Sequence, residues 1–441
     1  MAAPTYHLWE SGCQMNAADA LRAAALLERA GYVATDDGDH ADFVLLSTCV
    51  IRQQAEDKFL RRMEQLAGQV RHRRLAVAVM GCFVGFSASQ RAAAAERFPF
   101  VAVWMPPSDL SPLASYLAGR GLLPEGGTAP GPLPSSREGS AVTAHVPVVL
   151  GCSHACTYCI VPYRRGPERS RDAAEILSEV RSLAARGVKE VTLLGQIVDR
   201  YGLDREGSIR LPELLRRVAA VEGLARVRFL TSHPNWMGDE LIDTVATTPK
   251  LCPAFEVPVQ SGSDAVLERM RRGYRADDFR ALVGRIRSRI PDASVSTDVI
   301  VGFCGETEKD FADTMQLMRD TQVDMIRIAK YSPRPLTWSA RHLADDVPPE
   351  EKERRRVALD ALLREMLTKK HAALAGTTGE ILVESIEQTE GRRHGRRRGR
   401  FPDGLLVFAE NSGAQPGDIV PVRITVPGPY ASIAEATEGR K

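Results

Sequence analysis

Strand-like and helical patterns alternate along the first part of the chain. Four short apolar runs are separated by Ala-, Arg- and Glu-rich stretches with helical spacing, such as residues 17–30; the runs lie at 5–11, 42–47, 75–80 and 101–104. Strands that alternate with helices are typical of a parallel α/β sheet. We therefore predict a small parallel α/β domain over residues 1–118.

Residues 119–145 break this pattern. The segment is rich in Gly, Pro and Ser and follows neither the strand nor the helix period. This composition is typical of a flexible linker, which predicts a domain boundary there.

Beyond the linker, six strand-like runs alternate again with helical stretches up to residue 332, and a long helical stretch covers 349–375. Six βα units predict a partial (β/α)6 barrel within a domain at 146–375. The remaining residues, 376–441, carry short apolar runs divided by Gly, Pro and polar residues, which predicts a small β-barrel. The expected fold class is thus α/β, with a small C-terminal β-barrel.

Composition narrows the class of protein. The chain has 441 residues, 44% of them hydrophobic and 26% charged, and none of its apolar runs approaches the roughly 18 residues of a membrane span. The N-terminus lacks the pattern of a secretory signal. We expect a soluble, cytoplasmic protein with no membrane partner. The net charge of +2 by itself predicts no nucleic-acid partner, so such a prediction needs a local patch.

Three of the eight cysteines form a compact motif, Cys152-x3-Cys156-x2-Cys159, directly after the apolar run 146–150. In a reducing compartment, clustered cysteines favour metal binding or catalysis over disulfides. Three thiolates on one loop can hold three corners of a 4Fe-4S cluster and leave the fourth iron open for chemistry. A zinc site is the alternative, but zinc normally takes a fourth protein ligand, which no nearby residue supplies.

Residues 151–171, GCSHACTYCIVPYRRGPERSR, resemble the radical S-adenosylmethionine (SAM) superfamily and, within it, the MiaB-type methylthiotransferases. The resemblance implies that the open iron chelates SAM and that one electron cleaves it to a 5′-deoxyadenosyl radical. It also implies an electron donor such as flavodoxin or ferredoxin and a sulfur donor, which the motifs do not identify.

Cys13, Cys49 and Cys82 provide a second set of thiols. Each follows one of the first three predicted strands, and the carboxyl ends of parallel strands meet at one edge of the sheet, so we expect the three thiols to converge. The resemblance implies that they bind a second 4Fe-4S cluster. We interpret Cys252 and Cys304 as structural, since a single free cysteine is commonly a buried apolar residue.

Polar residues near predicted barrel strand ends are candidates for binding SAM or substrate, because such ends face the site in barrels. These residues are Gln196, Gln260 and Ser261; a role in turn hydrogen bonds is an equally open alternative. The family motif containing Gln196 has asparagines where Ile197 and Asp199 stand here. We leave His154 and His233 without a functional assignment.

The C-terminal segment resembles a TRAM domain, the small RNA-binding β-barrel attached to this family. Its run at 391–400 concentrates guanidinium groups suited to bidentate contact with phosphate. We predict RNA contacts from Arg392, Arg393, Arg396, Arg397, Arg398 and Arg400. The alternative is a solvated charged loop.

The resemblance as a whole implies an enzyme that modifies tRNA. MiaB-type proteins convert N6-isopentenyladenosine at position 37, in the anticodon loop, to its 2-methylthio form. Three alternatives remain: a methylthiotransferase acting on threonylcarbamoyladenosine, one acting on an aspartate of a ribosomal protein, or a non-catalytic tRNA-binding iron–sulfur paralogue. The motifs at 12–16 and 47–52 favour the MiaB branch, and the complete cysteine set favours an enzyme.

Overall fold

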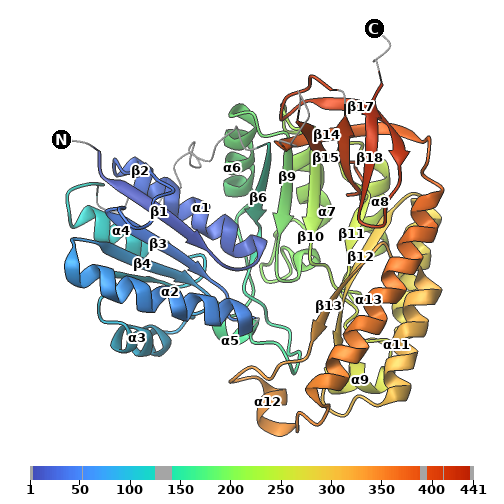
Figure 1. Ribbon diagram of the computed structural model, residues 1–441, viewed down its shortest axis with the longest axis horizontal. Helices are drawn as coiled ribbons and strands as arrows, with labels where there is room; N and C mark the ends of the chain where they lie inside the picture. Colours follow the sequence, from blue (N-terminus) through green and yellow to red (C-terminus); the bar gives the residue numbers. More distant parts are fainter. Residues whose placement is uncertain (1–2, 52, 125–141, 388–394, 411, 438–441) are drawn as a thin grey trace.

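The computed structural model describes residues 3–51, 53–124, 142–387, 395–410 and 412–437. Figure 1 shows an N-terminal sheet beside a central half-open barrel, with a small β-barrel packed at one end of the central unit. Among the described residues, no helix has both the length and the apolar character needed to cross a membrane.

The N-terminal sheet is wholly parallel and has five strands in the order β2-β1-β3-β4-β5. In chain order these are β1 (Thr5–Glu10), β2 (Val33–Ala34), β3 (Phe43–Thr48), β4 (Ala76–Gly81) and β5 (Val103–Met105). The four connecting helices are α1 (Gln14–Arg29), α2 (Gln53–His72), α3 (Ala88–Arg97) and α4 (Ser111–Ala118).

Apolar cores lie on both faces of this sheet, because helices cover both. On one face the alanines and leucines of α1 and α4 pack against Phe43 and Leu45. On the other, Phe59 and Met63 of α2 pack against Val44 and neighbouring strand residues. With both faces buried, β3 carries an uninterrupted buried run, as parallel strands usually do.

The central unit contains two three-stranded parallel sheets, ordered β10-β9-β6 and β11-β12-β13. A parallel bridge between Val227 and Leu251 connects them, so the six strands follow one another around a half-open barrel. The strands are β6 (Thr143–Pro147), β9 (Glu190–Leu194), β10 (Arg226–Leu230), β11 (Ala254–Glu256), β12 (Ser294–Val301) and β13 (Met325–Lys330).

Helices surround this barrel and share one large core with it. They are α6 (Ala173–Ala185), α7 (Leu211–Ala219), α8 (Asp239–Thr247), α9 (Asp264–Arg269), α10 (Ala276–Arg289), α11 (Glu308–Thr321), α12 (Trp338–His342) and α13 (Pro349–Ala372). Four short elements lie near the strand ends: β7 (Val149–Leu150), α5 (Val161–Arg165), β8 (Arg169–Ser170) and the 3-10 turn η1 (Val198–Arg200).

After α13 the chain forms a closed five-stranded barrel, in the order β14-β15-β16-β18-β17. Its strands are β14 (Thr378–Glu387), β15 (Arg396–Arg400), β16 (Leu406–Glu410), β17 (Ile419–Val426) and β18 (Ala431–Ala436). Two arginines of β10 hold it against the central unit. Arg226 donates to the carbonyls of Glu380 and Arg400, and Arg228 donates to those of Phe401 and Pro402.

The fold class predicted from the sequence is confirmed, including all six central strands and the closed C-terminal barrel. Strand boundaries differ in two places. The first barrel strand begins at Thr143, inside the segment predicted as a linker, of which residues 125–141 lie outside the described residues. The arginine run continues as strand β15, although it lacks the apolar alternation by which strands are recognised.

Candidate active site

The Cys152–Cys159 loop follows Gly151, a position at which any other residue would be strained. Gly151 has φ of +68°, and a Cβ there would lie 2.2 Å from the carbonyl oxygen of Pro167. Side chains are strained at such a φ, and the neighbouring backbone cannot move aside easily. The chain therefore turns sharply out of β7 into the cysteine loop.

Cys156 receives two hydrogen bonds within this loop region. His154 Nδ1 lies 3.1 Å from its Sγ, and Arg272 Nη1 donates to the Sγ at 3.2 Å. Burial raises the pKa of the Cys156 thiol, but the bond from His154 and the charge of Arg272 outweigh it and bring the pKa to about 7. Hydrogen bonds and positive charge of this kind favour a thiolate, which is the form that binds metal.

The other two thiols of the loop lie in a less polar setting. Burial raises the pKa of Cys152 to about 11 and that of Cys159 to about 12, and in both cases the charge of Cys156 adds to the effect. These thiols lose their protons only when a cation replaces them, so iron binding at this loop releases protons.

The structure brings together the three N-terminal cysteines. Cys13 caps α1 after β1, while Cys49 and Cys82 follow β3 and β4 at the same sheet edge. Burial raises the pKa of Cys49 to about 12, with added repulsion from Cys82 and Cys13. Gly12 leaves room for the approach, since a Cβ there would lie 3.0 Å from that of Cys49.

Each thiol set contains three free cysteines that lie near one another. All six cysteines are free thiols, and within each set the charges of the members influence one another. Yet the described residues contain no group of three His, Cys, Asp or Glu close enough to hold one metal ion. Three thiolates are the set of ligands that holds three corners of a 4Fe-4S cluster, so the chemistry of each set suits such a cluster.

Beside the barrel loop lies an aromatic and polar wall that the sequence did not reveal. The rings of His154 and His233 are 4.8 Å apart, and that of Trp236 is 4.6 Å from His233. Burial, followed by the charge of Arg272, lowers the pKa of His233 to about 2, so the ring is neutral at physiological pH. His233, in the sequence Thr231-Ser232-His233-Pro234, was the available signal, but a lone histidine is uninformative without its neighbours.

Asp199 belongs to the same wall. Its Oδ2 accepts a hydrogen bond from the backbone N–H of His233 at 2.9 Å, whereas burial raises the pKa of the carboxyl to about 7. Its Oδ1, the Nε2 of His233 and the hydroxyl of Ser232 are buried without a hydrogen-bond partner in the described part of the chain. Unsatisfied buried polar atoms are rare in proteins, so these three atoms are open to hydrogen bonds from a water or a bound molecule.

The three predicted SAM or substrate contacts lie in different surroundings. Gln196 follows β9 and is half-buried. Gln260 adopts φ of +75° and bridges β12 through its backbone, bonded to Asp298 and Ile300. Ser261 is fully buried, with its hydroxyl 3.3 Å from that of Thr314 in α11. Their contact with SAM or substrate stays a prediction.

The described arginines of the C-terminal run alternate across β15. Arg397 is buried and donates to the carbonyls of Gly395 and Ala414, while Arg396 pairs with Glu410. Arg398 and Arg400 both pair with Glu384, and each stays partly exposed. Arg392 and Arg393 lie outside the described residues. RNA contact by this run stays a prediction, with the outward arginines better placed for it than Arg397.

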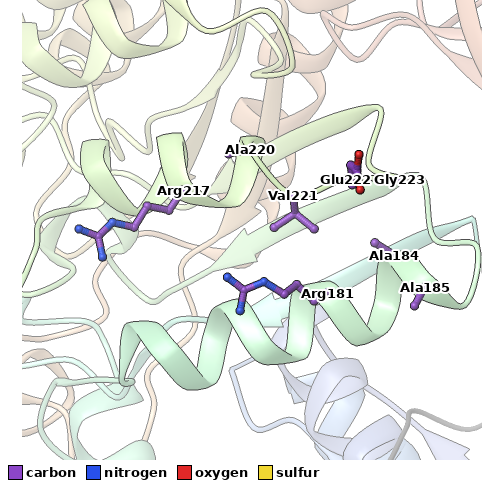
Figure 2. Close-up of a pocket in the computed structure, with 8 residues that line it drawn as sticks. All are labelled: Arg181, Ala184, Ala185, Arg217, Ala220, Val221, Glu222 and Gly223. Carbon is purple, nitrogen blue, oxygen red and sulfur yellow. The ribbon is translucent and has the colours of Figure 1, made fainter.

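Two cavities are prominent. A crevice of about 780 Å³ lies between α6 and α7, on the outside of the barrel; Figure 2 shows its lining residues Arg181, Ala184, Ala185, Arg217, Ala220, Val221, Glu222 and Gly223. It contains none of the predicted site residues. A smaller cavity of about 360 Å³ lies between the N-terminal and central units and is lined in part by Phe86, Leu150, Gly151 and Arg165.

Comparisons with known proteins agree with this arrangement. The profile of the radical SAM superfamily matches residues 146–318, and that of the uncharacterized protein family UPF0004 matches residues 5–105. The fold and the cysteine loop thus define a radical SAM protein, a class that implies a 4Fe-4S cluster and S-adenosylmethionine.

Curated relatives identify the family. A protein named tRNA-2-methylthio-N(6)-dimethylallyladenosine synthase from Chloroflexus aurantiacus is 41% identical over 97% of this chain and 90% of its own. One of the same name from Dehalococcoides mccartyi is 41% identical over 97% of both chains. The chain belongs to the MiaB-type methylthiotransferase family, which confirms the resemblance seen in the sequence.

A solved structure supports the fold. The radical S-adenosylmethionine methyltransferase TsrM from Kitasatospora setae, with cobalamin and a 4Fe-4S cluster bound, superimposes with a TM-score of 0.56 over 77% of each chain. At 16% identity this likeness concerns the fold alone.

Proposed function

We propose that this protein converts N6-isopentenyladenosine at position 37 of tRNA to 2-methylthio-N6-isopentenyladenosine by radical SAM chemistry. The observation that carries the proposal is the near full-length identity of 41% to relatives named for this reaction, together with two complete cysteine sets. We further propose two 4Fe-4S clusters, one on each set, and the anticodon loop as the part of the tRNA that is bound.

The six cysteines have separate tasks in this proposal. Cys152, Cys156 and Cys159 would hold one 4Fe-4S cluster, which would supply radical chemistry with SAM, and Cys13, Cys49 and Cys82 would hold a second, which would supply the sulfur to be transferred. His154 and Arg272 donate toward Cys156 and stabilise its thiolate. The wall of buried His233 and half-buried Trp236 and Asp199 limits the access of water to this side of the barrel.

The setting of Arg200 supports an isopentenyl over a threonylcarbamoyl substrate. A threonylcarbamoyl group has a carboxylate that needs a cationic partner. The Arg200 guanidinium is instead paired with Glu168 at 2.7 Å and stacked on the ring of Trp236 at 4.4 Å. Beside it, buried Ile197 packs with Cys152 and Trp236 and offers an apolar surface suited to a prenyl group.

We propose that the chain has three domains and one linker. Residues 1–118 form the methylthiotransferase domain, 119–145 the linker, 146–375 the radical SAM domain and 376–441 a TRAM-like RNA-binding domain. All strands of the three sheet systems fall within these limits except β6, which starts at Thr143, three residues before the limit at 146. We also propose a cytoplasmic location and a small electron-transfer protein, such as flavodoxin or ferredoxin, as electron donor.

The direct test uses anaerobically reconstituted enzyme with SAM, a reductant and tRNA that carries the isopentenyl group. We expect mass spectrometry of the digested tRNA to detect the 2-methylthio nucleoside, and unmodified tRNA to remain unchanged. Preferential turnover of threonylcarbamoylated tRNA would contradict the substrate while retaining the reaction type. Absence of product together with absence of 5′-deoxyadenosine would contradict the enzyme itself.

A further inference from the structure

One buried arginine connects the two cysteine sites. Arg165 ends the short helix α5 that follows the Cys152–Cys159 loop, and its side chain is only 2% exposed. It points away from its own loop and into the N-terminal site. Its Nε donates to Cys82 Sγ at 3.3 Å, its Nη1 to Asp19 Oδ2 at 3.3 Å, and its Nη2 to Asn16 Oδ1. All three guanidinium nitrogens are therefore used within the N-terminal unit.

The groups that receive Arg165 are themselves held in place. Asp19 Oδ2 also accepts from the Ser108 hydroxyl at 2.9 Å, and Asn16 Nδ2 donates to the carbonyl of Thr48 at 2.7 Å. Asn16 and Asp19 are almost completely buried. A guanidinium bound on three sides in this way has one orientation, which aims its Nε at the sulfur.

The same segment makes a second contact with the N-terminal site. Ile160, directly after Cys159, packs with Val50 and Cys82 in a small apolar cluster. The few residues between Cys159 and Arg165 thus touch the N-terminal site at both ends. This short segment therefore links the barrel loop directly to Cys82.

Charge at this point matters for a cluster held by Cys82. The guanidinium of Arg165 is positively charged, because arginine does not lose its proton in proteins, and its Nε donates directly to Cys82 Sγ. Hydrogen bonds to sulfur and nearby positive charge stabilise the more negative, reduced form of an iron–sulfur cluster.

We propose that Arg165 is a positioning residue that raises the reduction potential of the N-terminal cluster and fixes this cluster relative to the barrel loop. The proposal rests on the proposed function, in that it requires the second cluster. The sulfur–guanidinium contact and the chain connection to Cys159 carry it.

The test measures a potential and a spectrum rather than turnover. Full-length protein carrying C152A, C156A and C159A retains only the N-terminal cysteine set, so its electron paramagnetic resonance signal reports that cluster alone. In this background we expect Arg165→Met to lower the midpoint potential and alter the signal, and Arg165→Lys to lower it less because the charge remains. Arg164→Met is the matched control, since Arg164 lies on the same helix but donates to the carbonyl of Phe83; its shift is expected to be smaller.

A second variant is needed in case Arg165→Met loses its cluster. That substitution leaves the Asp19 carboxylate buried without its partner, which destabilises the fold around Cys82. The double variant D19N/R165M removes both charges, and we expect a potential still below that of the background protein, since Cys82 has lost an N–H donor. Unchanged potential and signal in variants that keep the iron content of the background would overturn the role of Arg165. A background protein without iron would instead overturn the second cluster, so the two failures are distinguishable.

Discussion

The two cysteine sites are assembled in opposite ways. The barrel site takes its three thiols from one loop of eight residues, Cys152–Cys159, which begins after the turn at Gly151 and has only a few contacts with distant residues, among them Arg272. The N-terminal site takes one thiol from each of three strand ends, so it exists only once β1, β3 and β4 have paired. A local site tolerates change in the surrounding sheet, whereas a site made from distant segments depends on the whole sheet and on its neighbours.

Replacing each cysteine set by alanine is expected to have the largest effect. Wild-type protein should hold roughly eight irons after anaerobic reconstitution, and either triple variant should hold roughly half. Loss of Cys152, Cys156 and Cys159 should abolish SAM cleavage, whereas loss of Cys13, Cys49 and Cys82 should leave uncoupled cleavage. Iron analysis and 5′-deoxyadenosine release measure both. A wild-type count near that of one cluster would contradict the two-site comparison.

Removing residues from Gly376 onward tests whether the two sites are independent of the C-terminal barrel. This barrel docks on Arg226 and Arg228 of β10 and bears the outward arginines of β15. We expect tRNA affinity to fall about tenfold or more at low salt, with a weaker salt dependence, because phosphate contacts are lost. Filter binding over a salt series measures this. Iron content should stay at the wild-type level, and tRNA affinity that does not change would remove the RNA-binding role of the barrel.

A pair of glycine substitutions compares the robustness of the two sites directly. A Cβ at Gly151 meets the backbone of Pro167 at 2.2 Å, whereas one at Gly12 meets the Asn16 amide, a side chain, at 2.5 Å. Backbone cannot yield as a side chain can, so Gly151→Ala should lose most of the barrel iron and Gly12→Ala less of the N-terminal iron. Each variant is made in the background lacking the other cysteine set. Equal iron loss in both would contradict the distinction.

The smallest expected effect concerns Asp199 in the wall beside the barrel loop. Burial raises the pKa of its carboxyl to about 7, above the value in the unfolded chain. The folded chain keeps this proton at pH values where the unfolded chain has released it, so the stability contribution is complete below the unfolded-state pKa and is lost as pH rises through the folded-state pKa.

Asp199→Asn, which restores an amide at this position, should remove that pH dependence. We expect the variant to gain about 2 kcal/mol of unfolding free energy relative to wild type between pH 5 and pH 8. Urea denaturation of the two apo proteins across this range measures the difference. Asp204→Asn serves as a control: the Ser170 hydrogen bonds lower the pKa of the Asp204 carboxyl in spite of burial, so it is ionised in both the folded and the unfolded chain over this range and its replacement should not change the pH dependence. Parallel curves for wild type and Asp199→Asn would contradict the buried ionisation.

Several features of the site were predictable because they repeat local patterns. The barrel loop has its three cysteines within eight residues, and the N-terminal cysteines each follow an apolar strand run, which suffices to bring them to one sheet edge. The arginine run was recognised as a basic patch but not as a strand. The Arg397 side chain faces inward because strand β15 pairs with β14 and β16, and no pattern in the arginine run itself indicates this pairing.

By itself the sequence determined the fold class, the two thiol sets and the family, since each depends on residue type, spacing and periodicity along one stretch of chain. The tertiary structure alone decided which charged groups surround the sulfurs. Arg165 and Arg272 lie 83 and 116 residues from the cysteines they contact, and Arg200 is occupied by Glu168 rather than free. Such contacts arise only when separately folded segments pack and water is excluded, because a buried guanidinium must then take whatever acceptors the neighbouring segment presents.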